Sequence, residues 1–164
     1  NSPTRGFVAG GSGPVGANSN DIQMITMATK GNAIKTGDLS RTTDNSTGAS
    51  NSVRGIISGG YSPTATPATN KIIKDLYYIN LASEGNSFNF GDLTVVRNRC
   101  GGTANQTRAM FIGGADFQSP SIYSKSIDSV IIASAGNAVE FGSLGSFKDQ
   151  FGATSDSHGG LGGF

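Results

Sequence analysis

Glycine-rich and acidic segments are the parts of this sequence whose residue types and spacing could support chemistry. The segment Gly11-Ser12-Gly13-Pro14-Val15-Gly16 matches G-x-G-x-x-G. That pattern binds a dinucleotide pyrophosphate when the loop joins a strand to a helix. Here Pro14 lies inside the match and no helical pattern follows it. We therefore interpret the segment as a loop and predict no cofactor.

Acidic residues recur before similar apolar runs, at Asp21, Asp75 and Asp128. They could offer oxygen ligands to calcium, but no D-x-D-x-D-G loop accompanies them. An Asx-type turn before a strand is the favoured interpretation. Glu84 and Glu140, the glutamates of the chain, lie in or beside predicted turns and form no distinctive pair for glycoside cleavage.

The chain has one cysteine and one histidine, so an intrachain disulfide is impossible and a zinc cluster is not indicated. Cys100 is expected to be a small buried hydrophobe. His158 lies in a glycine-rich segment without the Ser and Asp partners of a catalytic triad. We predict no catalytic residue and no metal site.

Composition excludes several classes of protein. The net charge is +1, too close to neutral for a protein that binds nucleic acid by neutralising phosphates. No apolar stretch is long enough for a membrane-spanning helix. Hydrophobic residues make up 35% of the chain and charged residues 14%, with 25 glycines, a composition unlike that of a helical bundle. We predict neither nucleic-acid binding nor membrane insertion.

The elements that must position these residues are repeated. The segment Thr4-Arg5-Gly6-Phe7-Val8-Ala9-Gly10-Gly11 recurs twice, and a degenerate fourth copy starts at His158. The repeat positions are Arg5, Arg54 and Arg108, with the glycine pairs Gly10 and Gly11, Gly59 and Gly60, and Gly113 and Gly114. The pairs are expected to supply positive φ and close backbone approach.

A second motif recurs with the same period. Gly31-Asn32, Gly85-Asn86 and Gly136-Asn137 are separated by 54 and 51 residues, and we expect each pair to form a tight turn. The chain is therefore predicted to be one repeat domain, 1–164. Its units are 4–52, 53–106 and 107–157, with a partial fourth motif at 158–164.

Each unit is predicted to contain three or four short strands, which is typical of a propeller blade. The apolar run from each arginine to its glycine pair is expected to lie nearest a common axis. The arginines could form a charged ring, although pairing with Asp or with backbone carbonyls of adjacent blades is favoured. The basic residues Arg41, Arg97 and Lys148 are their expected counterparts at blade edges, or are solvated.

The order of glycine pair, variable loop, Asp, apolar strand, Gly-Asn, Leu and basic residue resembles Kelch-type β-propeller repeats, which have a glycine doublet and about 50 residues per blade. The usual Kelch tryptophan is missing; Phe90 and Phe141 stand near its place, and Thr36 stands there in the first unit. The sequence pattern TRGxxxGG, followed by GNAxxFGDL and then an arginine, is similar to repeats in virion and tail-fibre proteins of tailed bacteriophages, notably those of marine cyanobacteria.

This resemblance implies an all-β fold of tandem Kelch-like blades, whose ring is completed by more repeats or by partners. It also implies a non-enzymatic structural or adhesive role in the virion, in assembly or host attachment. The partners would be other virion proteins or further copies of the chain, with host-surface glycan as a further candidate. The alternatives are a secreted carbohydrate-binding or carbohydrate-active protein on a Kelch scaffold, and a generic scaffold for protein assembly in the host cell.

Loops after the glycine pairs differ while the flanking motifs repeat. They span residues 12–20, 61–70 and 115–126, and we expect them to emerge on one face. Tyr61, Phe117 and Tyr123 are their candidate contact residues, because aromatic rings offer large apolar area at small entropic cost.

Overall fold

The protein is built from antiparallel β-sheets. The computed structural model describes residues 4–65, 71–117 and 120–155; the predicted partial fourth motif at 158–164, with His158, lies outside them. Among the described residues the only helical element is a single 3-10 turn, η1 (Pro14–Gly16), so the predicted all-β class is confirmed. No helix in this part of the chain is long and apolar enough to cross a membrane.

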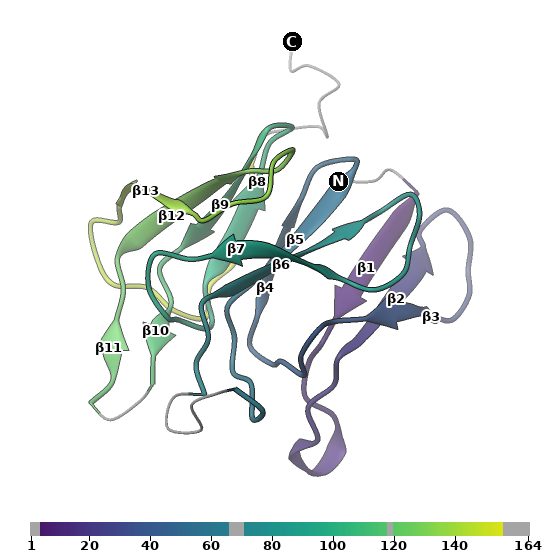
Figure 1. Cartoon of the computed structure of the whole chain (residues 1–164), viewed down its shortest axis with the longest axis horizontal. Coiled ribbons are helices and arrows are strands. Elements are labelled where there is room, and N and C mark those ends of the chain that lie inside the picture. Colours follow the sequence, from purple (N-terminus) through teal and green to yellow (C-terminus); the bar gives the residue numbers. More distant parts are fainter. Residues whose placement is uncertain (1–3, 66–70, 118–119, 156–164) are drawn as a thin grey trace.

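Three separate sheets contain most of the strands, and Figure 1 shows them side by side. The first has the order β1-β2-β3, with β1 (Arg5–Ala9), β2 (Asp21–Thr26) and β3 (Ile34–Asp38). The second has the order β4-β5-β6-β7, with β4 (Thr47–Ser50), β5 (Arg54–Ser58), β6 (Asp75–Asn80) and β7 (Phe88–Asp92). The third has the order β8-β9-β12-β13, with β8 (Gly101–Ala104), β9 (Arg108–Ile112), β12 (Ser126–Ile131) and β13 (Val139–Ser143). A small hairpin pairs β10 (Ala115–Asp116) with β11 (Ile122–Tyr123).

The sequence repeats correspond to these three sheets in a common register. Arg5 lies opposite Thr26, Arg54 opposite Asn80, and Arg108 opposite Ile131. Each repeat therefore corresponds to one sheet of three or four strands, as the sequence predicted, with the β10–β11 hairpin in addition in the third. We define a unit as one such sheet with the loops that follow its strands.

The predicted unit boundaries do not coincide with the boundaries between sheets. Boundaries at 52/53 and 106/107 fall inside sheets, because β4 pairs with β5 and β8 pairs with β9. The second and third sheets contact each other through their edge strands β4 and β8. The runs from arginine to glycine pair in these sheets, β5 and β9, lie one strand in from those edges, whereas the run in the first sheet, β1, is itself an edge strand. A Cβ on Gly102 would lie 2.7 Å from the carbonyl oxygen of Gly48, so small residues are required where these strands meet.

Hydrophobic side chains fill the spaces between neighbouring sheets. Ile22 and Leu39 of the first unit pack with Ile57, Ile79 and Leu81 of the second. A larger cluster joins the second and third sheets, with residues Ala49, Ile56, Leu76, Phe90, Leu93, Ala109, Phe111, Val130, Ile132 and Ala138. The second sheet therefore buries side chains on both of its faces.

The Gly-Asn pairs join sheets and do not form the hairpin turns, which corrects the prediction. The turn between β6 and β7 lies at 81–83, before the pair. Gly85 N then donates to Thr36 O of the first unit (3.1 Å), and Gly136 N donates to Phe90 O of the second unit (2.7 Å). The second and third pairs are thus bonded to the outer strand of the preceding sheet.

A β-bulge prepares each outer strand for this contact. Register shifts opposite Ile22 and Leu76 leave Thr36 and Phe90 as extra residues, and their carbonyls are the acceptors. The asparagine side chain completes the contact: Asn86 Oδ1 accepts from Asp38 N at 3.0 Å. The third unit repeats this bond one sheet further along, where Asn137 Oδ1 accepts from Asp92 N at 3.1 Å.

A backbone ladder joins the segments that follow the last strand of each sheet, β3, β7 and β13. Arg99 N donates to Asn45 O at 2.9 Å, and Gln150 N donates to Arg99 O at 3.0 Å. These three residues have φ values of 51°, 55° and 52° in the same order, Asn45, Arg99 and Gln150. Successive units are therefore related by a repeated contact at this level as well.

Candidate functional site

Four of the five acidic residues considered as catalytic or metal-binding candidates are paired with cations, namely Asp21, Asp75, Glu84 and Asp128. Among the described residues, no group of three or more His, Cys, Asp or Glu side chains could hold a metal ion. Lys35 Nζ contacts Asp21 at 2.7 Å and Asp38 at 2.8 Å, and these two carboxylates raise the pKa of the lysine to about 12. Glu84 pairs with Arg5 at 3.2 Å.

Asp128 does not occupy the position of Asp21 and Asp75, contrary to the sequence alignment. Asp21 lies opposite Asp38 and Asp75 opposite Asp92, whereas the corresponding residue of the third sheet is Ser126, opposite Ser143. Asp128 stands two residues further along, where its side chain is buried.

Arg97 and Asp128 form a buried ion pair between units. Their side chains are both 0% exposed, and Arg97 Nη2 lies 2.8 Å from Asp128 Oδ2. Asp128 also accepts from the backbone N and the hydroxyl of Thr94, each at 2.8 Å. The pair fixes the segment after β7 against β12, and its full burial gives it a structural role.

The basic residues Arg41, Arg97 and Lys148, predicted as counterparts of the repeated arginines, do not all occupy equivalent positions. The second glycine of each pair donates to Thr43 O, Arg97 O and Lys148 O, so these three residues are equivalent. Arg41, predicted to match Arg97, lies two residues before Thr43 and pairs with Asp75 at 3.4 Å. Thr43 therefore occupies the basic position in the first unit.

Two of the repeated arginines contact the following unit: Arg5 pairs with Glu84, and Arg54 bonds to backbone carbonyls, as the favoured interpretation expected. Arg54 donates to Ile132 O at 3.1 Å and Ala133 O at 2.8 Å, with its guanidinium 4.8 Å from the centroid of the Tyr78 ring. Arg108 is exposed on the third sheet.

The glycine pairs have the predicted backbone conformation. All six residues have positive φ, from 56° at Gly59 to 108° at Gly60. A Cβ on Gly113 would lie 2.5 Å from Lys148 O, and a Cβ on Gly10 would lie 2.7 Å from Thr43 O. The pairs therefore allow the chain to pass close to the segment that leads into the next sheet.

Cys100 is buried, as predicted. Desolvation raises the pKa of its thiol to about 11. The neutral, enclosed thiol is a poor nucleophile.

The loops after the glycine pairs project from the same end of the three sheets, at the lower end of Figure 1, where η1 and the β10–β11 hairpin are seen. Two of the predicted contact residues come together there: the Phe117 and Tyr123 rings lie edge to face with centroids 5.7 Å apart. Arg99, which the sequence did not indicate, places its guanidinium 4.5 Å from the Phe117 centroid. Tyr61 is half-buried in the neighbouring loop, where its backbone pairs with Asp44 and Ile72. Residues 66–70 and 118–119 of these loops lie outside the described part of the chain.

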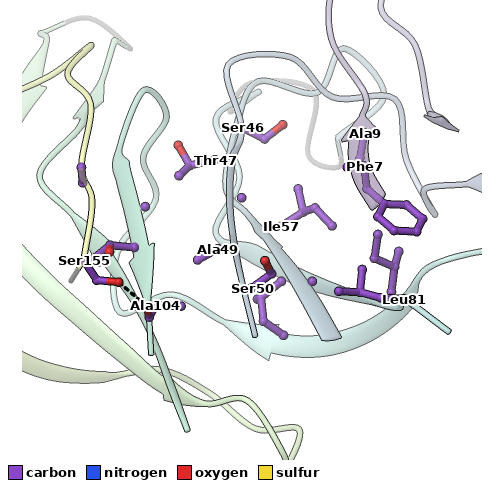
Figure 2. A pocket seen from close by; sticks show the side chains of 18 of the residues that line it. Phe7, Ala9, Ser46, Thr47, Ala49, Ser50, Ile57, Leu81, Ala104 and Ser155 are labelled. Carbon is purple, nitrogen blue, oxygen red and sulfur yellow. Dashed lines mark hydrogen bonds between the residues drawn. The ribbon is translucent and has the colours of Figure 1, made fainter. Parts of the chain in front are cut away.

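A cavity of about 520 Å³ is lined by strands of all three sheets, including Gly102, Thr103 and Ala104 of β8. Figure 2 shows Phe7 and Ala9 of β1 on one side of it and Thr47, Ala49 and Ser50 of β4 on the other. Ser155 closes one side, where its hydroxyl donates to Ala104 O at 2.7 Å. The described lining offers hydroxyls, apolar groups and the Arg5 guanidinium but no carboxylate, so it holds no acid–base pair.

Comparison with known proteins finds no match to a protein-family model or to a curated protein.

Proposed function

We propose that this chain is a non-enzymatic structural or adhesive module of a bacteriophage particle, with sheets that act as Kelch-like propeller blades. The observation that carries the proposal is a division of labour along the chain. Most of the repeated residues join sheets or shape the backbone between them: Arg5, Arg54, the glycine pairs, and the Gly-Asn pairs at Gly85 and Gly136. The loops that differ between units lie at one end, where a rigid scaffold commonly carries its binding residues.

The proposed contact surface is the cluster of Arg99, Phe117 and Tyr123, with Tyr61 in the adjacent loop. Tyr123 is 45% exposed, and its ring lies edge to face with the ring of Phe117. The guanidinium of Arg99 lies over the Phe117 ring. Aromatic faces with a guanidinium beside them suit the apolar faces and hydroxyls of a sugar, or a loop of a neighbouring protein. We propose that this surface mediates host attachment or particle assembly and that the protein is located in the virion.

A glycan array probed with the purified chain tests the adhesive role. The variant Tyr61→Ala/Phe117→Ala/Tyr123→Ala should keep the fold and lose binding to the glycans that the wild type retains. Phe88→Ala is the matched control, because it removes an exposed aromatic residue from the outer strand β7. Binding that survives the triple substitution would refute the loop assignment.

The catalytic alternative is tested on the same array. Release of reducing sugar from a bound glycan, abolished by substitution of one carboxylate, would replace the proposed role with a carbohydrate-active one. Detection of the chain in purified particles by antibody tests the virion location separately.

A further inference from the structure

We propose that the outer side of the third sheet binds the outer side of the first sheet of a second copy of this chain, through the Gly-Asn contact that joins sheets within one copy. This inference rests on the proposed structural role and deepens it by naming the partner. Its test measures self-association, so it can fail without affecting the glycan-binding test.

The acceptor half of the contact is already formed in the third unit. The register shift opposite Ile127 leaves Phe141 as the extra residue of a bulge, as it leaves Thr36 and Phe90 in the first two sheets. In those sheets the carbonyl of the extra residue accepts a hydrogen bond from the next unit. Phe141 O is therefore in the position of an acceptor for a following unit, although no such unit is described.

The glycine beside each bulge shows where the following unit belongs. A Cβ added to Gly37 or Gly91 would overlap the carbonyl of the Gly-Asn pair of the next unit. A Cβ added to Gly142, the equivalent residue of the third sheet, meets nothing within 4 Å among the described residues. Gly142 thus keeps room for a contact that the described residues do not make.

The donor half lies at the other end of the array. Gly31-Asn32-Ala33 aligns with Gly85-Asn86-Ser87 and Gly136-Asn137-Ala138. Ser87 and Ala138 are each 8% exposed because they are docked on the preceding sheet, whereas Ala33 is exposed. By equivalence, Gly31 N and Ala33 N would donate to Phe141 O and Ser143 O, and Asn32 Oδ1 would accept from Ser143 N.

Apolar side chains on the same two surfaces are exposed where their internal equivalents are buried. Met27 is 57% exposed, against 4% for Leu81 and 0% for Ile132. At the other end Phe141 is 58% exposed, against 3% for Phe90. These surfaces are therefore matched in their apolar groups as well as in their backbone hydrogen bonds.

A second copy fits this pair of surfaces because one chain carries both complementary halves. The contact is head-to-tail, so each copy keeps one donor and one acceptor surface for further association. Two copies bring six sheets together, within the four to eight blades of closed propellers, and closure would leave only short, protected sheet edges.

Sedimentation velocity of the 164-residue chain over a range of concentrations tests the inference. We expect concentration-dependent association that Gly142→Ala weakens at least about tenfold, because its methyl group occupies the space of the docking carbonyl. Gly142 has no positive φ and no neighbour within 4 Å, so circular dichroism and the urea midpoint should be unchanged. Gly145→Ala, at another open glycine three residues away, is the matched control.

Cross-linking gives the orientation of the contact. Asn32→Cys and Phe141→Cys proteins, treated with a short bis-maleimide, should yield dimers when mixed and few when treated alone; Cys100 is buried and stays unmodified. A wild-type chain that remains monomeric, association that is insensitive to Gly142→Ala, or equal cross-linking in separate and mixed samples would each overturn the inference.

Discussion

Replacing Asp128 with Asn should destabilise the protein by about 3–5 kcal/mol, because it leaves a buried guanidinium without its counter-charge. Arg97 and Asp128 are both fully buried, with 2.8 Å between Nη2 and Oδ2. The other acceptors of the guanidinium include the backbone carbonyls of Ser126 at 3.1 Å and Phe111 at 3.3 Å. These neutral groups satisfy hydrogen bonds but do not neutralise the charge.

The size of the effect follows from burial. An exposed ion pair contributes about 0–1 kcal/mol, whereas removal of one member of a buried pair exposes the other to the full cost of desolvation. Asp128 also accepts from Thr94 N at 2.8 Å, and the amide of Asn provides one neutral oxygen for this bond. Against a total stability of about 5–15 kcal/mol for a domain, the loss would be a large fraction.

Urea unfolding followed by far-UV circular dichroism measures this loss. Lys74→Ala is the control: Lys74 lies 3.1 Å from Asp92 in a pair with side chains 48% and 37% exposed, and its loss should cost below about 1 kcal/mol. The double variant Arg97→Met/Asp128→Leu should recover most of the stability, because no buried charge remains. The reasoning is refuted if Asp128→Asn costs no more than Lys74→Ala, or if the double variant is as unstable as the single one.

Three further predictions concern the contacts that build the array. Gly91→Ala should lower stability by about 1–3 kcal/mol in thermal unfolding, because its Cβ would overlap the carbonyl of Gly136 and its φ is 152°; a midpoint equal to that of Gly145→Ala would contradict this. Asn51→Ala should lower the free energy of unfolding by about 1–3 kcal/mol in urea, because it removes the Oδ1 acceptor of the backbone N of Val53 and of Arg54, both at 2.8 Å. An unchanged urea midpoint would refute this role of Asn51. Burial raises the pKa of Cys100 from 9.0 to about 11, so the contribution of the neutral thiol to stability is complete below about pH 9 and declines as the pH rises towards 11. The difference in free energy of unfolding between wild type and Cys100→Ala, measured in urea at pH 8 and pH 10.5, tests this decline. A difference that does not change with pH would contradict the raised pKa.

Much of the fold could be predicted because two motifs recur with one period. The all-β class, the number of units and the positive φ of the glycine pairs follow from residue types and spacing. The assignment of strands to sheets did not follow, because Thr47–Ser50 and Gly101–Ala104 are small and weakly apolar. Their pairing with β5 and β9 depends on close packing between β4 and β8, which a single sequence does not display.

The error at Asp128 had a signal that could have corrected it. Asp21 and Asp75 each stand ten residues before the glycine of their Gly-Asn pair, at Gly31 and Gly85. The residue ten positions before Gly136 is Ser126, and Asp128 is eight positions before it. Alignment on the downstream glycine gives the register of the sheet, because the strand and its turn have fixed length whereas the upstream loop varies.

Of the candidate contact residues, the sequence indicated Phe117 and Tyr123 through their loop but gave no signal for Arg99. Arg99 stands before β8, and its ring contact depends on the backbone ladder that sets its φ of 55°. Its equivalents are Asn45 and Gln150, so the cation is specific to one junction while the backbone geometry is common to all three. Because Arg99 occurs in only one of the three equivalent positions, a comparison of residues shared by the repeats does not reveal it.

The repeated motifs are best understood as the two sides of a contact between sheets. A Gly-Asn pair and the glycine after a bulge are separated by only a few residues in the sequence, yet each meets its partner in a neighbouring unit, as Gly85 meets Gly37 and Gly136 meets Gly91. Within its own unit the Gly-Asn pair lies beyond the hairpin turn, so the turn does not require it. The constant spacing between the Gly-Asn pair and the bulge glycine therefore reflects the geometry of the contact between sheets.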